Sequence, residues 1–351
     1  MKKKMALCTP IPKKQMDIIE QYCDVTICGE LKHGKGNVTE DMTREECMGN
    51  ELVVLGDEYA GADTITAWAQ AGMKFMGVAK GTPATVDYDA IDKAGLELSY
   101  TPGRNRVAVA EFNIGLMIAA ARHITLSSTG LAKGEHVGPA VDDIYDVPDV
   151  KNVTFGPLDE KHPFVDYGIG FELYGKTLGI AGYGAIGREV AVRAKAFGME
   201  ILAYDPYCPA EKIEADGAKA VDLDTMLAQS DIISIHLPVI PSCKGIVNKD
   251  WFSKMKPTAY VINTARAYVI DQKDIDEALQ NKTIAGAAVD VYWQEPVPAN
   301  HPLLSMRNVV CTPHMAGLTT DVDGWSGSMM GDEVIAYLNG VPSKYIWKIN
   351  K

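Results

Sequence analysis

The chain has 351 residues, of which 47% are hydrophobic and 23% charged, with a formal net charge of −12. This length exceeds what one typical hydrophobic core holds and predicts two domains. The composition is typical of a soluble globular protein, and the acidic balance argues against nucleic acid or an anionic membrane as partner. The apolar run after Lys4 reaches Pro10 too soon for a signal peptide, and no other apolar stretch is long enough to cross a bilayer. We expect a cytoplasmic protein.

The cysteines are odd in number and far apart, at positions 8, 23, 28, 47, 208, 243 and 311. None of them forms a Cys-x-x-Cys pair or a Cys/His cluster with the spacing of metal ligands. Cys8 and Cys311 lie in apolar, strand-like runs, where a small buried thiol is the simplest interpretation. We expect no bound metal and no structural disulfide.

In the first third of the chain, short apolar runs alternate with segments of helical period, the pattern of a parallel sheet covered by helices. The predicted strands are Met5–Thr9, Asp24–Cys28, Leu52–Leu55, Phe75–Val78 and Leu96–Tyr100. The predicted helices are Pro12–Tyr22, Ala62–Ala71 and Tyr88–Lys93. One long apolar helix then runs from about Val107 to Ala132. Its composition favours burial between domains or against a second subunit.

A second alternating series begins at Lys176. Its predicted strands are Leu178–Ala181, Glu200–Tyr204, Ile232–His236, Tyr260–Asn263, Ala285–Val289 and Val309–Thr312. Six strands with intervening helices match a complete dinucleotide-binding unit. A last helix, Trp325 to Leu338, is predicted to return to the first domain.

Between the two series, about residues 135–172 are rich in Pro, Gly and Asp and show no clear period. This segment is long for a connection inside a compact domain. Two interpretations stay open: an ordered excursion that covers a site or a neighbouring subunit, and a surface loop.

A glycine-rich loop, Gly182-Tyr183-Gly184-Ala185-Ile186-Gly187, joins a predicted strand to a predicted helix. Gly182 allows a tight turn, Gly184 lets the backbone approach a pyrophosphate, and Gly187 lets helix and strand pack closely. The helix N-terminus, which includes Ala185 and Ile186, offers free N–H groups to phosphate. The loop therefore predicts a bound dinucleotide.

Asp205 ends the next apolar run, Ile201–Tyr204. A carboxylate in this position accepts hydrogen bonds from the adenosine ribose hydroxyls and repels a 2′-phosphate, so NAD is favoured over NADP. The alternative is a structural glycine turn with an unrelated surface aspartate.

The chain resembles the D-isomer-specific 2-hydroxyacid dehydrogenases, of the phosphoglycerate dehydrogenase type, over nearly its whole length. The motifs that carry the resemblance are GYGAIG at 182–187, HLP at 236–238, INTAR at 262–266, VDVYWQEP at 289–296 and TPHMAG at 312–317. The resemblance implies an α/β fold with two doubly wound domains. A flavodoxin-like substrate domain is expected at residues 1–104 and 320–351, and a Rossmann NAD-binding domain at 105–319 with the excursion at 135–172.

For the chemistry, the resemblance implies three residues that each follow a predicted strand. His314 is the expected acid and base, Glu295 its orienting partner, and Arg266 the group that binds and polarises the substrate. Taken singly, each has a structural alternative: an arginine after a strand is usually a surface ion-pair partner, Pro313-His314 a capped loop, and Glu295-Pro296 an ordinary turn. Their joint order favours catalysis.

Further cofactor contacts implied by the resemblance lie near the strand ends, at His236, Pro238, Thr264, Ala265, Asp290 and Gly317. Asp290 is expected at the nicotinamide carboxamide, with a buried capping role as the alternative. His236 has a purely structural role as its alternative.

The segment expected to bind the substrate carboxylate departs from the family pattern. The family commonly has an arginine and a GxGxDN-like run here, whereas this chain reads VAKGTPATVD at 78–87. Lys80, with the N–H groups of Gly81 and Thr82, offers a replacement anion site, unless Lys80 is simply a solvated loop residue. Arg104, before the long helix, together with Lys80 suits a polyhydroxylated or phosphorylated acid better than a small apolar one.

The predicted function is NAD(H)-dependent interconversion of a 2-keto acid and a D-2-hydroxy acid, with the acid and the direction left open. One alternative on the same fold is a phosphite or formate dehydrogenase, although formate enzymes place Gln where Glu295 stands. Another is an NADH-sensing scaffold like the corepressors built on this fold. The resemblance implies a homodimer.

Overall fold

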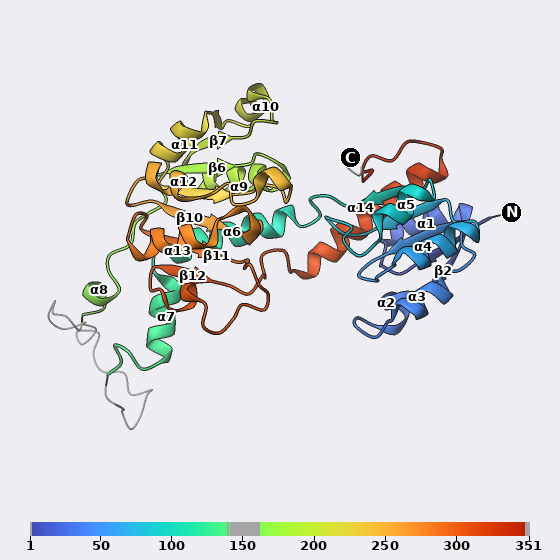
Figure 1. Ribbon diagram of the computed structural model, residues 1–351, viewed down its shortest axis with the longest axis horizontal. Coiled ribbons are helices and arrows are strands. Elements are labelled where there is room, and N and C mark those ends of the chain that lie inside the picture. The colour runs from blue at the N-terminus through green and yellow to red at the C-terminus, as the bar shows by residue number, and fades with distance from the viewer. Residues whose placement is uncertain (1, 139, 141–161, 348–351) are drawn as a thin grey trace. The chain divides into compact units, whose positions relative to one another are not determined.

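The computed structural model describes residues 2–138, 140 and 162–347. The chain divides into two compact units (Figure 1). Unit 1 is made of Met1–Asn105 with Leu318–Lys351, and unit 2 of Arg106–Gly317. Each unit contains its own parallel sheet, so the fold class is α/β with two doubly wound domains, as predicted.

Unit 1 is built on a five-stranded parallel sheet of order β2-β1-β3-β4-β5. The strands are β1 (Lys3–Leu7), β2 (Cys23–Ile27), β3 (Leu52–Leu55), β4 (Phe75–Val78) and β5 (Glu97–Tyr100). Every residue of β3 and β4 is buried, as a parallel sheet with helices on both faces requires. This is the flavodoxin-like strand order.

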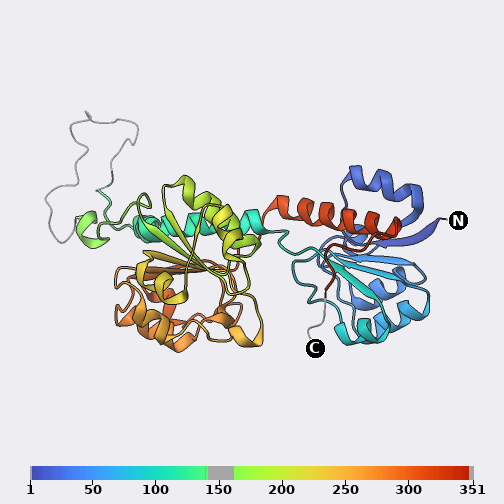
Figure 2. The same cartoon turned by 90° about the horizontal axis from the view of Figure 1, so that it is seen from above.

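The helices of unit 1 are α1 (Lys13–Tyr22), α2 (Gly29–His33), α3 (Glu40–Glu46), α4 (Ala62–Gln70), α5 (Tyr88–Lys93) and α14 (Thr320–Leu338). Helix α14 brings the C-terminal part of the chain onto α1 and β4 (Figure 2). A Cβ at Gly77 would lie 2.5 Å from the sulfur of Met330, so this glycine lets α14 pack closely on the sheet.

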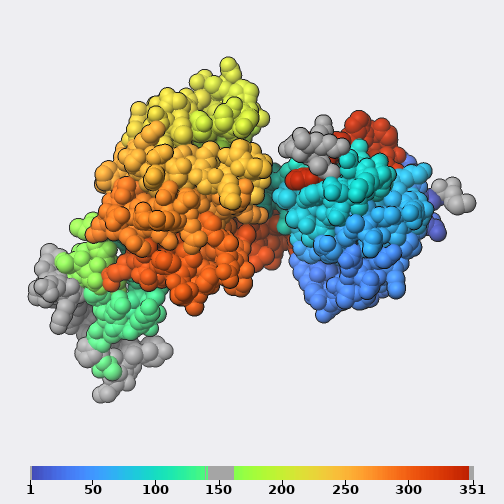
Figure 3. All heavy atoms as spheres, in the orientation of Figure 1, coloured from blue at the N-terminus to red at the C-terminus, as the bar shows by residue number. Residues whose placement is uncertain are grey.

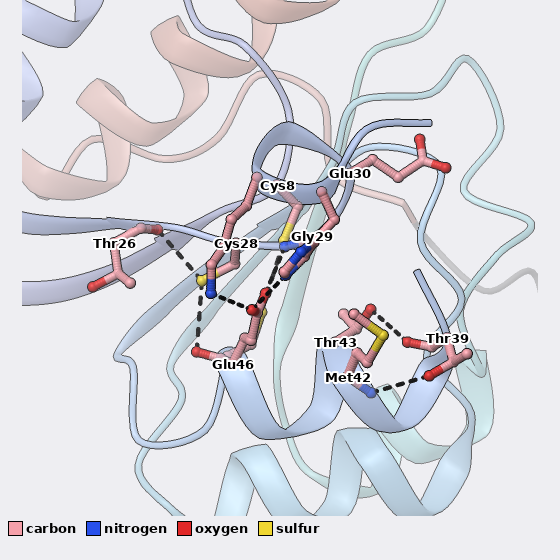
Figure 4. A network of polar contacts seen from close by, with 12 residues as sticks. Cys8, Thr26, Cys28, Gly29, Glu30, Thr39, Met42, Thr43 and Glu46 are labelled. Atoms are coloured by element: carbon pink, nitrogen blue, oxygen red, sulfur yellow. Dashed lines mark hydrogen bonds and ion pairs between the residues drawn. The ribbon is translucent and has the colours of Figure 1, made fainter. Parts of the chain in front are cut away.

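Helices α2 and α3, of five and seven residues, have no counterpart in the sequence prediction. Thr39 caps α3 by accepting the N–H of Met42, and Glu46 accepts the N–H of Gly29 at the start of α2 (Figure 4). Local side-chain hydrogen bonds of this kind, rather than an amphipathic pattern, hold the two short helices.

Unit 2 is built on a seven-stranded parallel sheet of order β12-β11-β10-β9-β6-β7-β8. The strands are β6 (Thr177–Ala181), β7 (Glu200–Tyr204), β8 (Lys219–Ala220), β9 (Ile232–Ile235), β10 (Tyr260–Asn263), β11 (Gly286–Val289) and β12 (Val309–Cys311). This is the Rossmann order with one further strand at the β12 edge. The sequence predicted six of the seven; β8 has only two residues, too few to form a recognisable run.

The α-helices of unit 2 are α6 (Arg106–Ala121), α7 (Ile124–Ala132), α8 (Pro163–Asp166), α9 (Ala185–Ala196), α10 (Ala210–Ala215), α11 (Leu223–Gln229), α12 (Lys249–Lys254) and α13 (Gln272–Gln280). Within the described residues of unit 2, short 3₁₀ turns lie at η2 (Pro241–Cys243), η3 (Ala267–Val269) and η4 (Pro302–Ser305). In the space-filling view, the yellow and orange segments of unit 2 cover most of the face turned to the viewer (Figure 3).

The prediction of one long helix from Val107 to Ala132 is wrong. The segment forms two helices, α6 and α7, bent by 70° at a break that contains His123. His123 has φ 54°, in the left-handed region, which ends the α-helical path. The sequence does not predict this break, because apolar residues occur on all sides of both helices and leave no one-sided period that a bend could interrupt.

Helix α6 belongs to the core of unit 2, where Ile114, Met117 and Ala121 are buried and the helix packs on α9. Helix α7 instead exposes Ile124 and Leu131, at 49% and 58%. Within the described residues no single helix is long and apolar enough to cross a membrane. The bent pair α6–α7 passes such a test only when the two are taken together, as buried core helices also do.

Of the predicted excursion at 135–172, residues 139 and 141–161 lie outside the described part of the chain. The flanks of this segment are tied together: His136 contacts Asp166 at 3.0 Å, and the hydroxyl of Tyr167 donates to Glu135 at 3.0 Å. Arg307 bonds to Asp166 as well, at 3.0 Å. The described flanks are therefore ordered parts of unit 2.

All seven cysteines are free thiols. Cys8 is buried, as expected, whereas Cys311 is only partly buried, because it lies in β12 at the edge of the sheet.

Candidate active site

The predicted cofactor and catalytic residues of unit 2 follow six adjacent strands. Gly182 follows β6, Asp205 follows β7 and His236 follows β9. On the other side, Arg266 follows β10, Glu295 follows β11 and His314 follows β12. Because all strands of the sheet are parallel, their carboxyl ends share one edge, which is where ligands bind in such folds.

The three positions of the loop after β6 are glycine for different structural reasons. Gly182 has φ 95°, and a Cβ there would lie 2.7 Å from the carbonyl oxygen of His236. A Cβ at Gly187 would lie 2.3 Å from the carbonyl oxygen of Gly182. A Cβ at Gly184, in contrast, would meet no atom within 4 Å. Packing therefore requires the first and last glycine, while the middle one borders open space.

The start of α9 presents unsatisfied donors to that space. Among the residues that the structure describes, the backbone N–H groups of residues 184–187 form no hydrogen bond. These groups and the positive end of the helix dipole suit a phosphate. The chain thus fits the pyrophosphate of a dinucleotide on geometry alone.

Asp205 shapes the same loop. Its Oδ2 accepts the N–H of Tyr183 at 2.8 Å, and its Oδ1 accepts the N–H of Tyr207 at 2.8 Å. Each carboxylate oxygen has a second lone pair, which leaves capacity for ribose hydroxyls. The carboxylate is therefore part of the glycine loop's own hydrogen bonding.

The imidazole of His314 and the carboxylate of Glu295 form a direct pair, with Nδ1 and Oε2 at 2.7 Å. The other carboxylate oxygen accepts the N–H of Tyr292 at 3.0 Å. Desolvation acts to raise the pKa of Glu295, but the bond from His314, the N–H of Tyr292 and the charge of Arg266 outweigh it and lower that pKa. The pair is therefore electrostatically coupled to Arg266.

The loop that carries His314 is held by Asp290, which is fully buried. Its two carboxylate oxygens accept the N–H groups of Met315 and Ala316, each at 2.8 Å, and the hydroxyl of Thr312 at 2.6 Å. These bonds fix His314 at φ 58°, a left-handed conformation that is unfavourable for a residue other than glycine. The structure thus gives Asp290 a capping role, the alternative named above.

Arg266 is exposed and stands at the start of η3. Asn263, which is buried, braces its loop by accepting the N–H of Ala265 at 3.0 Å and donating to the carbonyl of Arg266 at 3.1 Å. One guanidinium nitrogen donates to the carbonyl of Ala265 at 2.7 Å. A guanidinium has five donors, so a fork remains for a carboxylate.

A buried polar chain runs beneath the cofactor loops. Asn113 of α6 donates to the hydroxyl of Thr264 at 3.1 Å and accepts the hydroxyl of Ser234 at 3.1 Å. Ser234 in turn lies 2.9 Å from Nε2 of His236. Although His236 is only half-buried as a residue, desolvation of its imidazole lowers its pKa to about 3. His236 therefore forms one end of this buried polar chain.

The sequence analysis missed Asn113 and Ser234 in this network. A signal was present, because Asn113 is a single amide in an otherwise apolar helix. Of the remaining predicted cofactor residues, Pro238 is exposed and Gly317 is the last residue of unit 2.

Besides Arg266, the predicted substrate-binding residues lie in unit 1: Lys80, Gly81 and Thr82 follow β4, and Arg104 follows β5. Lys80 forms an ion pair with Asp57, so it is not a solvated loop residue. In the described chain, the N–H groups of Gly81 and Thr82 form no hydrogen bond. Arg104 donates to the hydroxyl of Ser326 at 2.8 Å. Searched over the described residues, no group of His, Cys, Asp and Glu side chains has the arrangement of a metal site.

Comparison with known proteins agrees with this geometry. Residues 160–316 match the family described as D-isomer specific 2-hydroxyacid dehydrogenase, NAD binding domain. The chain is also 33% identical over 337 residues to the glyoxylate reductase of Thermofilum pendens, which covers 94% of this chain and 90% of that protein. The chain belongs to the D-isomer-specific 2-hydroxyacid dehydrogenase family.

A second relative in this family is the D-3-phosphoglycerate dehydrogenase of Archaeoglobus fulgidus, 33% identical over 313 residues. That match covers 89% of this chain and 54% of the relative, so the chain spans about half the length of such relatives. The solved structure of a glyoxylate reductase from Paecilomyes thermophila has a TM-score of 0.74 and 25% identity, with 100% of this chain and 99% of that chain covered.

Membership in the family gives unit 2 its cofactor. The matched region, residues 160–316, is the family's NAD-binding domain, and it contains the glycine loop and Asp205. The free N–H groups at the start of α9 and the open space at Gly184 agree with this assignment.

Proposed function

We propose that the protein interconverts a 2-keto acid and a D-2-hydroxy acid with NAD(H). The observation that carries this proposal is the 2.7 Å pair of His314 and Glu295, coupled to Arg266 along the edge that also holds the glycine loop. The family supports the reaction type, while the catalytic residues and the acid are proposals.

In this scheme His314 handles the proton at the substrate oxygen. Its Nδ1 is bonded to Glu295, which leaves Nε2 to face the substrate. In reduction the imidazolium donates its proton to the keto oxygen, and in oxidation the neutral imidazole removes the hydroxyl proton. NAD, when bound, supplies or accepts the hydride.

Arg266 binds the substrate carboxylate through two parallel N–H donors and polarises the keto oxygen. Glu295 stabilises the imidazolium and fixes the ring. In unit 1, Lys80, the N–H groups of Gly81 and Thr82, and Arg104 contribute to binding the acid. Asp205 favours NAD over NADP through the ribose hydroxyls.

The test is consumption of NADH by the purified full-length protein with a panel of 2-keto acids. The panel runs from glyoxylate and pyruvate to hydroxypyruvate, its phosphate, and four-carbon sugar-derived and aromatic acids. We expect turnover with at least one acid and a fall in kcat/KM of about 10²–10⁴ in His314→Ala. The matched control is His136→Ala, a histidine on the flank of the excursion that bonds to Asp166 and has no proposed role in the reaction.

Two outcomes contradict the proposal. If NADH binds tightly but no keto acid of the panel causes its oxidation, a sensor is favoured. Reduction of NAD⁺ by phosphite or formate, with no activity on any 2-hydroxy acid, would move the protein to the anion dehydrogenases of the same fold.

We also propose a homodimer, supported by the exposed Ile124 and Leu131 of α7. Light scattering after size exclusion would give twice the chain mass of 38.0 kDa. A monomer at micromolar concentration would refute this proposal. The cytoplasmic location stays a prediction from the sequence.

A further inference from the structure

Unit 1 contains a cavity of about 210 Å³ at the carboxyl edge of its sheet. The ends of β1, β3 and β4 line it, together with α2 and α14. Two of the lining residues, Cys8 and Glu30, are labelled in Figure 4. In the order β2-β1-β3-β4-β5 the chain changes direction between β1 and β3, and ligands of open α/β sheets bind at such a switch point.

The charges around this cavity are balanced. Lys35, Lys80 and Arg104 supply three positive charges, and Glu30, Asp57 and Asp323 supply three negative ones. Two of the three carboxylates, Asp57 and Asp323, are already paired with these cations. Lys80 contacts Asp57, while Asp323 lies 3.1 Å from the ammonium of Lys35 and 3.9 Å from the guanidinium of Arg104.

The two cations nearest the interior are well shielded from water. The side chains of Lys80 and Arg104 are 22% and 17% exposed, whereas those of Asp57 and Asp323 are 46% and 54% exposed. Burial lowers the pKa of Arg104, since the guanidinium has lost much of its hydration. Its one direct hydrogen bond within the described chain goes to Ser326, so most of its donors have no protein partner.

This balance discriminates among ligands. A phosphate offers only acceptors and two negative charges, so Asp57 and Asp323 would repel it as strongly as the cations attract it. An alkyl chain would further desolvate Arg104 without giving it a partner. A hydroxyl can accept from the cation and donate to the carboxylate of the same pair.

We propose that this cavity binds the hydroxylated carbons of a sugar-derived acid, with Asp57 and Asp323 selecting hydroxyl groups over phosphate at Lys80 and Arg104. The proposal rests on the function proposed above and names its substrate class. A water molecule takes up about 30 Å³ in the liquid, so the cavity has room for about three hydroxylated carbons.

The first experiment measures binding without turnover. NADH-loaded full-length protein is titrated calorimetrically with erythronate, with 2-hydroxybutyrate as the alkyl analogue of equal length, and with 3-phosphoglycerate. We expect Kd for erythronate to be about tenfold or more below the other two, the effect of leaving a buried charged donor unpaired. Equal or tighter binding of either competitor would overturn the proposal.

The second experiment changes the selecting carboxylates. In Asp57→Asn and Asp323→Asn, we expect erythronate to bind several-fold more weakly and 3-phosphoglycerate several-fold more tightly. The matched control is Asp321→Asn, which removes the same charge from an exposed position of α14 outside the cavity. An unchanged ratio of the two Kd values in both cavity variants, or the same change in the control, would overturn the proposal.

These measurements separate this proposal from the proposed function. Erythronate that binds selectively to a protein without any reductase activity would keep the cavity assignment and refute only the reaction. Reductase activity confined to alkyl or phosphorylated keto acids would refute only the substrate class, if 2-hydroxybutyrate or 3-phosphoglycerate also binds more tightly than erythronate.

Discussion

The carboxyl edges of the two sheets are built differently. In unit 2 the proposed chemical side chains are held by residues at most 26 positions away: Asp290 fixes the loop of His314, and Asn263 braces that of Arg266. In unit 1, Arg104 is held by Ser326 of α14, which lies 222 positions away in the chain. From this difference we expect unit 2 to act on every 2-keto acid alike and unit 1 to select among them.

After His314→Ala, the largest expected effect is that of Arg266→Ala, because the variant loses the proposed carboxylate fork. We expect kcat/KM to fall by about 10²–10³ for every 2-keto acid, since two charge-assisted hydrogen bonds are lost. Steady-state kinetics on the panel measures this, with exposed Arg122→Ala as control. A fall in kcat/KM confined to one acid would show that Arg266 selects among substrates, as is expected of unit 1, and would remove the difference between the two edges.

Asp205→Ala tests the cofactor part of the unit 2 edge. We expect KM for NADH to rise roughly ten- to hundredfold, with a smaller rise for NADPH, because a charged acceptor for the ribose hydroxyls is lost. The control is Asp224→Ala, which removes one exposed carboxylate from the same unit. An unchanged ratio of KM for NADH to KM for NADPH would show that Asp205 only shapes the glycine loop.

Asn113→Leu tests whether the buried network supports the unit 2 edge. The variant leaves Thr264 and Ser234 without their buried partner, so we expect the free energy of unfolding to fall by about 1–3 kcal/mol. Urea unfolding measures this, with exposed Asn281→Leu as control. A concurrent rise in Kd for NADH would assign the network a positioning role. Wild-type stability would show that the network contributes little.

Arg104→Ala tests the unit 1 edge. Whereas Arg266→Ala is expected to impair every acid, this variant is expected to impair only some of them. We expect kcat/KM to fall about tenfold for hydroxylated keto acids and little for alkyl ones, because one hydrogen-bonding cation is lost. The ratio of the two kcat/KM values is the measurement. A uniform loss across the panel would place Arg104 with Arg266 and remove the distinction between the two units.

Glu295→Gln gives the smallest expected effect. The amide can still accept a hydrogen bond from the ring of His314 but has lost the charge, so we expect kcat/KM to fall about two- to tenfold. Steady-state kinetics on the panel measures this, with exposed Glu277→Gln as control. A wild-type kcat/KM would show that the charge of Glu295 contributes little to the reaction.

The lowered pKa of Glu295 has a further consequence for stability. A carboxyl whose pKa is lower in the folded state than in the unfolded state stabilises the fold above the unfolded value, near 4.3, and loses this contribution as the pH falls through the folded pKa. Because the two side chains are 40% and 37% exposed, solvent screening keeps the contribution small.

The sequence predicted most elements well, and the failures have definite causes. Buried parallel strands such as β3 and β4 are continuous apolar runs, and their predicted bounds match those of the structure. The bend at His123 escaped prediction because it depends on one backbone conformation rather than on a pattern. Helices α2 and α3 escaped because side-chain hydrogen bonds to the backbone, such as those of Glu46 and Thr39, hold them.

The candidate site divides in the same way. The sequence could predict that five residues lie along one edge of the sheet, because each follows a strand and parallel strands end at one edge. They are Gly182, Asp205, Arg266, Glu295 and His314. It could not predict that Asp290 caps the loop of His314, since a capping aspartate and a cofactor-binding aspartate occupy the same place in a motif.

By itself, the sequence determined the family, the two parallel sheets and the residues proposed for the chemistry, because strand periodicity and local motifs are properties of short segments. Only the tertiary structure decided which charges meet. The contacts of Lys80 with Asp57, of Arg104 with Asp323, and of Asn113 with Thr264 join segments that no local pattern relates. Long-range contacts of this kind set the charge balance of the cavity in unit 1, and with it the proposed class of acid.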